Sequence, residues 1–211
     1  MAMTAVTETH RITDVETLEK LYGVPTGAPV DKEIDYLHPH NQKLIAASPF
    51  FVLATGGPGG MDASPRGDAP GFVVVEDDKT LLIPDRRGNN RVDSLRNIIV
   101  DPRVALLFLV PGIGETLRVN GRAEIRTDPS LLGRFSVEGK LPRSVIVVRV
   151  DTCFFQCARA IFRSKLWEPA QHVERASLPS TGTILSDITK GRFDGKEYDK
   201  VLYGRLKSAL Y

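Results

Sequence analysis

The sequence predicts a mainly β fold of the α+β class, in which six strands form a barrel. Short apolar or alternating segments recur between residues 50 and 155, separated by brief turns and few helices. A parallel βαβ sheet would instead need a helix-length crossover after almost every strand. Helical patterns lie mainly before residue 48 and after residue 183. We therefore expect a β-barrel with peripheral helices and with helical N- and C-terminal extensions.

Two helical segments are expected before the first strand. Thr13 and Glu16 have the spacing of a capping box, and apolar residues follow at helical spacing as far as Tyr22. Gly23 then ends this helix. A second helical segment is expected over residues 31–47, interrupted or offset at Pro39.

Six segments have the composition or the alternation of strands, at residues 50–55, 71–75, 80–83, 104–110, 115–126 and 144–155. The second and third are expected to form a hairpin, and the glycine-rich residues 56–60 are expected to form a loop. A helix is expected over residues 91–100, and Asp128 is expected to begin a short one. Asp194 is expected to cap a helix near the C-terminal end.

Composition and charge narrow the possible functions. The 28 basic and 26 acidic residues give a net charge of +2, too balanced to indicate a nucleic-acid-binding protein. No apolar run approaches the roughly 18–20 residues that span a bilayer, and the first residues lack the apolar core of a secretory signal. We therefore expect a cytoplasmic protein with no nucleic-acid or membrane partner. The histidines and cysteines form no metal-binding pattern, and no nucleophile has a partnered base, so no metal ligand and no catalytic residue is assigned.

A phosphate site is the chemistry that the residues favour. Two expected turns carry guanidinium groups: S-P-R-G-D contains Arg66, and D-R-R-G-N-N-R contains Arg87 and Arg91. The second turn opens the predicted helix, whose free backbone N–H groups suit a phosphate, and arginine can grip phosphate oxygens in two places. Residues 88–90 add a glycine and two asparagines that can cap the helix. From these residues alone, a solvated arginine cluster around an ordinary helix cap is the alternative.

Five motifs follow one another along the chain: S-P-R-G-D (64–68), D-R-R-G-N-N-R (85–91), N-x-x-x-D-P (97–102), T-L-R-V-N-G-R-A-E (116–124) and C-x-x-x-C-A-R-A-x-x-R-S-x-L-W (153–167). In this order and spacing, and over about residues 34–169, the chain resembles the pyridoxamine 5′-phosphate oxidase-like family of FMN-binding split β-barrels. It resembles more narrowly the bacterial flavin-binding branch of that family.

The resemblance implies an FMN-binding flavoprotein that forms a homodimer and acts as an FMN-dependent oxidoreductase on a small molecule, with FMN in a groove at the dimer interface. The cofactor-binding residues that it implies are Arg66, Gly67, Asp68, Arg87, Asn89, Asn90, Arg91, Arg118, Arg163 and Ser164. The last three are expected to approach from neighbouring strands or from the second chain. A non-catalytic flavin- or haem-binding protein of the same fold is the alternative function.

Two of these residues have competing structural roles. Asp68 can accept a hydrogen bond from a flavin ring N–H or can be a surface turn residue. Arg118 can lie near the pyrimidine end of the flavin, where it would favour the anionic reduced form. It can equally form a cross-strand ion pair with Glu115 or Glu124.

The chain also departs from true pyridoxamine phosphate oxidases. Those enzymes carry Ser-Arg-Lys at the phosphate turn, where this chain has R-R-G-N-N-R, and they end with a tryptophan and an Arg-His segment that the tail lacks. The resemblance therefore supports FMN but not a vitamin B6 substrate. The expected domains are a helical extension at 1–48, the barrel at 49–169, and a helical tail at 170–211 packed on the barrel or on the partner chain.

Overall fold

The computed structural model describes residues 10–211, which belong to two compact units, residues 1–33 and 34–211. The described part of the first unit holds α1 (Val15–Tyr22) and α2 (Ala28–Asp31). The carboxylate of Asp14 caps α1 by accepting a hydrogen bond from the Thr17 backbone N–H at 2.8 Å. The helix was expected, but its cap is Asp14 rather than Thr13.

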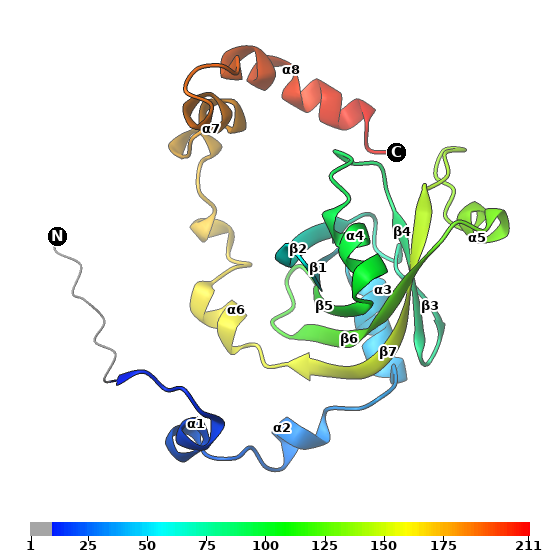
Figure 1. The fold of residues 1–211 in the computed structure, drawn as a ribbon, viewed down its shortest axis with the longest axis vertical. Coiled ribbons are helices and arrows are strands. Elements are labelled where there is room, and N and C mark those ends of the chain that lie inside the picture. Colours follow the sequence, from blue (N-terminus) through cyan, green and yellow to red (C-terminus); the bar gives the residue numbers. More distant parts are fainter. Residues whose placement is uncertain (1–9) are drawn as a thin grey trace. The chain divides into compact units, whose positions relative to one another are not determined.

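The second unit is built on one antiparallel sheet of seven strands in the order β2-β1-β5-β6-β7-β4-β3 (Figure 1). The strands are β1 (Phe50–Gly57), β2 (Gly60–Gly67), β3 (Val74–Asp77), β4 (Thr80–Asp85), β5 (Arg103–Leu109), β6 (Thr116–Arg126) and β7 (Ser144–Gln156). All six expected strands are present. The expected count of six is wrong, because β2 adds a seventh.

The strand that the sequence did not reveal, β2, occupies one edge of the sheet. Gly57 pairs with Gly60, so only Pro58 and Gly59 form the turn between β1 and β2, where a longer loop was expected. The S-P-R-G-D segment, expected to be a turn, lies mostly within this strand. An edge strand tolerates Pro65 because its outer N–H side needs no ladder partner.

The larger of the two hydrophobic clusters contains side chains from β1, β4, β5, β6 and β7. Burial alternates along β1 and β5, where Phe51, Leu53, Leu106 and Phe108 are all at most 2% exposed. The ring centroids of Phe51 and Phe108 lie 5.0 Å apart, within the range of favourable aromatic pairs. Burying each side chain of this size contributes about 1.5–3 kcal/mol, so these strands supply much of the stability of the unit.

Helices cover the sheet and follow it. They are α3 (Pro39–Ala47), α4 (Asp93–Val100), α5 (Pro129–Gly133), α6 (Arg159–Ser164), α7 (Thr181–Ile188) and α8 (Gly195–Ser208). Ile45 of α3 and Ile98 of α4 are buried in the same core as the strands. Asp194 caps α8 by accepting a hydrogen bond from the Glu197 backbone N–H at 3.0 Å, as expected. Within residues 10–211, no helix is both long and apolar enough to cross a membrane.

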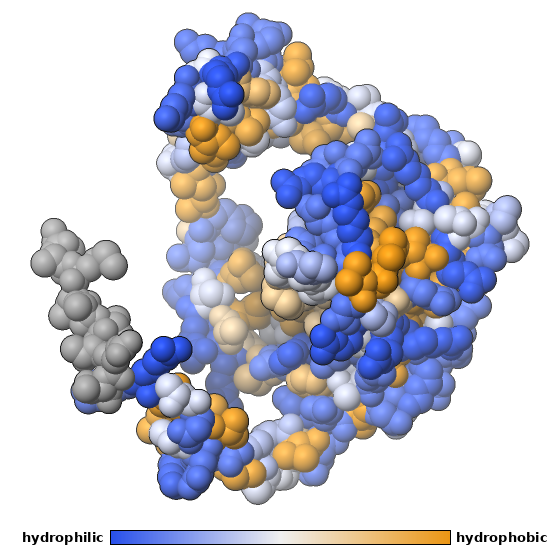
Figure 2. Space-filling view, viewed as in Figure 1, coloured by the Kyte–Doolittle hydropathy of each residue, from blue (hydrophilic) through white to orange (hydrophobic). Residues whose placement is uncertain are grey.

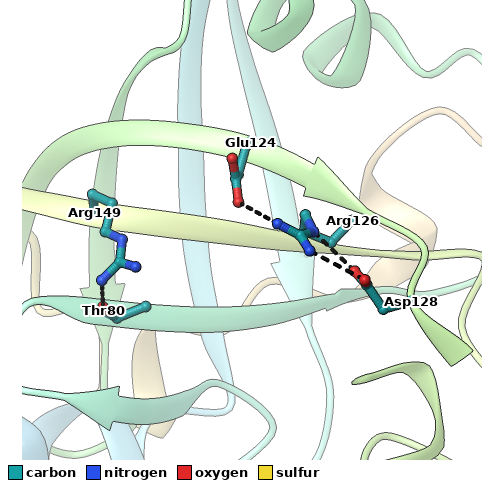
Figure 3. Close-up of polar contacts among 5 residues, drawn as sticks. All are labelled: Thr80, Glu124, Arg126, Asp128 and Arg149. Carbon is teal, nitrogen blue, oxygen red and sulfur yellow. Dashed lines mark hydrogen bonds and ion pairs between the residues drawn. The ribbon is translucent and has the colours of Figure 1, made fainter. Parts of the chain in front are cut away.

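Several arginines outside the core are held by local partners. Arg126 at the end of β6 bonds Asp128 at 2.8 Å and Glu124 at 3.3 Å (Figure 3). Arg149 of β7 donates a hydrogen bond to the Thr80 hydroxyl of β4 at 2.5 Å (Figure 3). Exposed pairs of this kind contribute about 0–1 kcal/mol, so these arginines mainly order the surface of the sheet.

A bulge bends the long pair β6–β7. The register shifts between Asn120 and Gly121, and Gly121 comes so close to β7 that an added Cβ would lie 2.1 Å from the carbonyl oxygen of Arg149. A bulge increases the local twist of a strand, and here it lets the two strands curve around the core. Only glycine permits this approach, because the atom opposite belongs to the backbone and cannot rotate away.

We expect Gly121→Ala to lower the free energy of unfolding by about 2–3 kcal/mol, because the new methyl group forces the two strands apart. Gly204→Ala is the control, since an added Cβ at this helical position meets no atom within 4 Å. The control should gain about 0.5–1 kcal/mol from helix propensity. Urea denaturation of both variants measures the difference, and equal stability of Gly121→Ala and the parent would contradict the close approach.

Candidate functional site

A cavity of about 560 Å³ opens where β2 ends and the loop between β4 and α4 begins. It is lined by residues 62–67 of β2, residues 84–95 of β4, the loop and α4, and by Phe72, Arg143 and Ser144. Its volume lies in the roughly 300–1,000 Å³ range typical of small-molecule sites. Five arginines and three aspartates are among the lining residues, so the cavity carries an excess of positive charge.

Two crossed ion pairs join the end of β2 to the end of β4. Arg66 Nη1 lies 2.5 Å from Asp85 Oδ1, and Arg86 Nε lies 2.7 Å from Asp68 Oδ2. The S-P-R-G-D and D-R-R-G-N-N-R motifs therefore each contribute one arginine and one aspartate, and each pair joins one motif to the other. All four side chains are at most 20% exposed. Because charge pairs interact more strongly away from water, these contacts fix the distance between the two segments.

Arg66 also has a donor without an acceptor. Its Nε is buried and finds no hydrogen-bond partner among the described residues. A buried unsatisfied polar group costs about 1–3 kcal/mol, and such groups commonly mark a site for a ligand or an ordered water. Since Arg66 lines the cavity, a ligand with an acceptor group at this wall would satisfy it.

The loop between β4 and α4 has an unusual backbone. Asn90 (φ +62°) and Val92 (φ +51°) are both left-handed, a conformation that asparagine tolerates and that a β-branched residue rarely adopts. Strain of this kind costs about 1–3 kcal/mol and clusters at functional sites. Helix α4 begins at Asp93 rather than at Arg91, and Val92 provides no side-chain cap. The backbone N–H groups of its first turn therefore receive no side-chain cap from that residue.

Neither asparagine of the loop caps the helix, contrary to the expectation. The side-chain oxygen of Asn89 accepts a hydrogen bond from the Arg91 backbone N–H at 3.0 Å, which closes a local Asx turn. The side-chain oxygen of Asn90 accepts one from Arg143 Nη1, also at 3.0 Å. The loop is thus shaped by its own side chains and by Arg143 from the segment before β7.

Two hydrogen bonds attach α4 to the strands beneath it. The buried Ser94 hydroxyl donates to Asp62 Oδ2 on β2 at 2.7 Å, and Asn97 Nδ2 donates to the Thr55 hydroxyl on β1 at 3.1 Å. An added Cβ at Gly57 would lie 2.2 Å from Asn97 Oδ1. This close packing holds the start of α4 against one wall of the cavity.

Arg91 and Arg87 differ in their partners. Arg91 is 77% exposed and forms an ion pair with Asp93 at 2.8 Å, and the hydrogen bond to this carboxylate raises the pKa of the guanidinium above its ordinary value. Arg87 is exposed and pairs with no carboxylate of the described residues. Both line the cavity, and each can reorient toward an anion because its side chain is exposed.

Six of the ten residues expected to bind the cofactor line this cavity: Arg66, Gly67, Arg87, Asn89, Asn90 and Arg91. The other four, Asp68, Arg118, Arg163 and Ser164, are not among the lining residues of the described chain. Arg118 lies over the ring of Phe154, 5.0 Å from its centroid, and forms neither expected ion pair. Arg163 and Ser164 lie on α6. Binding roles for these residues stay predictions.

Asp68 is fully engaged by its own chain. Its carboxylate accepts hydrogen bonds from Arg86 Nε at 2.7 Å, from the Ala69 backbone N–H at 2.8 Å and from the Tyr211 hydroxyl at 2.6 Å. Burial alone would raise the pKa of Asp68, but the hydrogen bonds from Tyr211, Ala69 and Arg86 outweigh it, so the pKa lies below its ordinary value. The side chain is only 5% exposed, and it holds Arg86 in place.

Sequence reasoning missed several lining residues, namely Asp62, Ser64, Asp85, Ser94, Arg143 and Ser144. Ser64 and Asp85 stand in the two arginine-containing motifs but were not assigned to the ligand, and the other four stand in no motif that suggests binding. Asp85 pairs with Ser144 across the β4–β7 ladder, and that register brings the segment before β7 to the cavity. Strand pairing between β4 and β7 is therefore the information that would have found Arg143 and Ser144.

Several solved structures match part of this chain at low sequence identity. HupZ of Group A Streptococcus is 18% identical, with a TM-score of 0.47 over 57% of this chain and 94% of that chain. General stress protein 26 of Bacillus anthracis is 18% identical, with a TM-score of 0.40 over 54% and 88%. An FMN-binding protein of Syntrophomonas wolfei is 13% identical, with a TM-score of 0.43 over 54% and 82%. Similarities this weak carry no argument about function.

A comparison with curated proteins gave no match. A model of the pyridoxamine 5′-phosphate oxidase family, however, matches residues 37–157. That span covers more than half of the 211 residues and contains all seven strands, α4 and the arginine-rich loop. The chain belongs to the pyridoxamine 5′-phosphate oxidase family.

Proposed function

We propose that the protein is an FMN-binding flavoprotein that acts as an FMN-dependent oxidoreductase on a small molecule. The observation that carries this proposal is the cavity, in which an arginine-rich loop with a left-handed backbone faces a buried arginine donor without an acceptor. Membership of the pyridoxamine 5′-phosphate oxidase family supports a flavin as the ligand. The departures from true pyridoxamine phosphate oxidases argue for another substrate.

The loop between β4 and α4 would hold the phosphate group. A phosphate monoester carries about −1.5 to −2 charges near neutral pH and offers three strong acceptor oxygens. Arg87 and Arg91 supply guanidinium donors, and residues 88–90 bring backbone N–H groups to the same wall. Arg91 would then divide its donors between Asp93 and the phosphate, which its high exposure allows.

The end of β2 would lie along the flavin ring. Gly67 lines the cavity, and the adjacent Arg66 is fixed by Asp85 with its Nε still lacking an acceptor. When bound, FMN would supply the redox chemistry, and the protein would set its position and electrostatic environment. Arg66 would donate a hydrogen bond to the ring from a position that its ion pair with Asp85 fixes.

A second copy of the chain would complete the groove. Arg118, Arg163 and Ser164 lie outside the cavity of one chain, and we propose that they contact the cofactor held by the partner. Apolar surface near the cavity supports an interface: Ile99 and Val100 of α4 are 77% and 63% exposed. Figure 2 shows apolar side chains gathered around α4, next to the hydrophilic loop that precedes it.

The absorbance spectrum of the purified protein tests the proposal most directly. We expect a yellow protein, or a colourless one that takes up added FMN in a one-to-one ratio, and whose flavin is reduced by NAD(P)H or another donor. The same preparation should sediment at twice the mass of a 23.2 kDa chain. Failure to take up FMN would exclude the proposed function, and bound flavin without turnover across a panel of donors would indicate a binding protein.

We expect Arg91→Ala to weaken FMN binding by about 1.5–3 kcal/mol, because it removes hydrogen bonds to a charged group. Arg103→Ala is a matched control: Arg103 is also exposed (75%) and also paired with an aspartate two residues away, Asp101, but it does not line the cavity. Titration of apoprotein followed by flavin fluorescence measures both affinities. If the two variants bind FMN equally well, Arg91 does not hold the phosphate.

We propose that Asp68 acts on the site through Arg86 rather than on the ligand. Because the folded-state pKa of Asp68 is depressed, its contribution is fully present above the ordinary pKa of about 3.9 and is lost as pH falls through the lowered pKa. We expect Asp68→Asn to cost about 3 kcal/mol at pH 7, since it leaves Arg86 without its buried partner.

The stability difference between Asp68→Asn and the parent should shrink steadily as the pH falls below 4. Urea denaturation at a series of pH values between 7 and 3 measures it. Asp187→Asn, at an exposed helical position, should change stability little at any pH. A difference that stays constant across this range would show that the charge of Asp68 is not what stabilises Arg86.

A further inference from the structure

A second cavity, of about 270 Å³, adjoins the first. Four of its lining residues are cationic, Arg86, Arg87, Lys140 and Arg143, and the other three are Leu141, Pro142 and Tyr211. No acidic residue lines it within the part of the chain that the structure describes. A concave surface with charges of one sign concentrates the opposite charge, so this cavity favours an anion.

One of the four cations is already neutralised. Arg86 is paired with Asp68 at 2.7 Å, and its Nη1 donates a hydrogen bond to the carbonyl oxygen of Phe135 at 2.7 Å. It therefore forms a fixed part of the wall. Its charge adds little attraction for a ligand.

The other three cations remain available. Arg143 donates to Asn90, which is neutral, and Arg87 and Lys140 have exposed side chains. Among residues 10–211, no carboxylate forms an ion pair with any of these three. The nearby Glu138 is close enough for its charge to help raise the pKa of the Tyr211 phenol, but it does not line the cavity. A phosphate group here could receive hydrogen bonds from all three side chains.

Tyr211 forms part of the wall of this cavity. Its hydroxyl donates to Asp68 at 2.6 Å, and Arg86 lies 5.4 Å from the centre of its ring. Figure 1 shows the end of the segment after α8 returning to the loop that follows β4. The cavity is thus assembled from three segments that are distant in sequence, around residues 86–87, 140–143 and 211.

We propose that the second cavity binds a second phosphate group, beside the one proposed for the first cavity. Arg86, Arg87 and Arg143 line both cavities, so the two anions would share one arginine wall. Lys140 lines only the second cavity and is its specific donor. The second phosphate can belong to a longer flavin cofactor or to a separate phosphorylated ligand, and both sources present the same chemistry to these side chains.

Titration of inorganic phosphate into the full chain without flavin, followed by calorimetry, tests the site itself. We expect Lys140→Ala to lower the phosphate affinity about tenfold or more, the loss of one hydrogen bond to a charged group. Lys43→Ala, at an exposed position that lines neither cavity, should leave it unchanged. Arg91→Ala distinguishes phosphate binding in the first cavity from phosphate binding in the second, because Arg91 lines only the first cavity.

Flavin titrations then distinguish the two sources of the phosphate. If the second phosphate belongs to the cofactor, the parent should bind FAD more tightly than FMN, and Lys140→Ala should lose this preference while keeping its affinity for FMN. If it belongs to a separate ligand, FMN-loaded protein should still bind phosphate in a manner that depends on Lys140.

The flavin titrations rest on the proposed function, but the phosphate titration does not. The phosphate titration therefore tests the second cavity even if the chain binds no flavin. Phosphate affinity and FAD preference that are both indifferent to Lys140→Ala would overturn the proposal.

Discussion

The ends of two strands that lie far apart in the sheet order are tied together by charge. Arg66 and Asp68 belong to the end of β2, at one edge of the sheet, and Asp85 and Arg86 belong to the end of β4, next to the other edge. Their crossed ion pairs bring these two strand ends together. Buried pairs contribute modestly to net stability but are costly to break, so they act here mainly to fix geometry. Arg86 lines both cavities, and Arg66 and Asp85 line the first.

With Arg66 and Arg86 held in this way, the remaining arginines of the loop are left for a ligand. Arg87 and Arg91 project from a backbone that is left-handed at Asn90 and Val92, and the packing of α4 on β1 and β2 keeps that backbone in place. The buried, paired guanidinium groups and the exposed ones thus have separate tasks. The former hold the walls, and the latter can close on an anion without disturbing the sheet.

Much of the fold follows from local patterns in the sequence, and the parts that do not follow have a physical reason. The apolar strands, the β3–β4 hairpin and α4 were predictable because burial imposes a period that the residues show. Strand β2 was not, because an edge strand with one exposed face needs little apolar alternation, and Pro58-Gly59 looked like part of a longer loop. The start of α4 was predicted at residue 91 instead of Asp93. Nothing in the sequence indicates that Val92 adopts a left-handed backbone conformation.

The cavity was predictable only where a motif marked it. Arginine and asparagine before a helix identified the loop, whereas Arg143 and Ser144 reach it through the register of β4 against β7, which the sequence does not display. Asp68 was assigned to the ligand because the family resemblance implied it, but three donors of its own chain already surround it. Which donor meets a carboxylate depends on tertiary contacts, such as that of Tyr211.

The reciprocal arrangement of the two motifs has a consequence for protein engineering. Each motif carries one member of each ion pair. Transplanting either segment alone into another scaffold would therefore bury one arginine and one aspartate without their ion-pair partners. The transferable module is therefore the two strand ends together with the ladder that sets their spacing. A host barrel accepts it only where its own edges approach to the same separation.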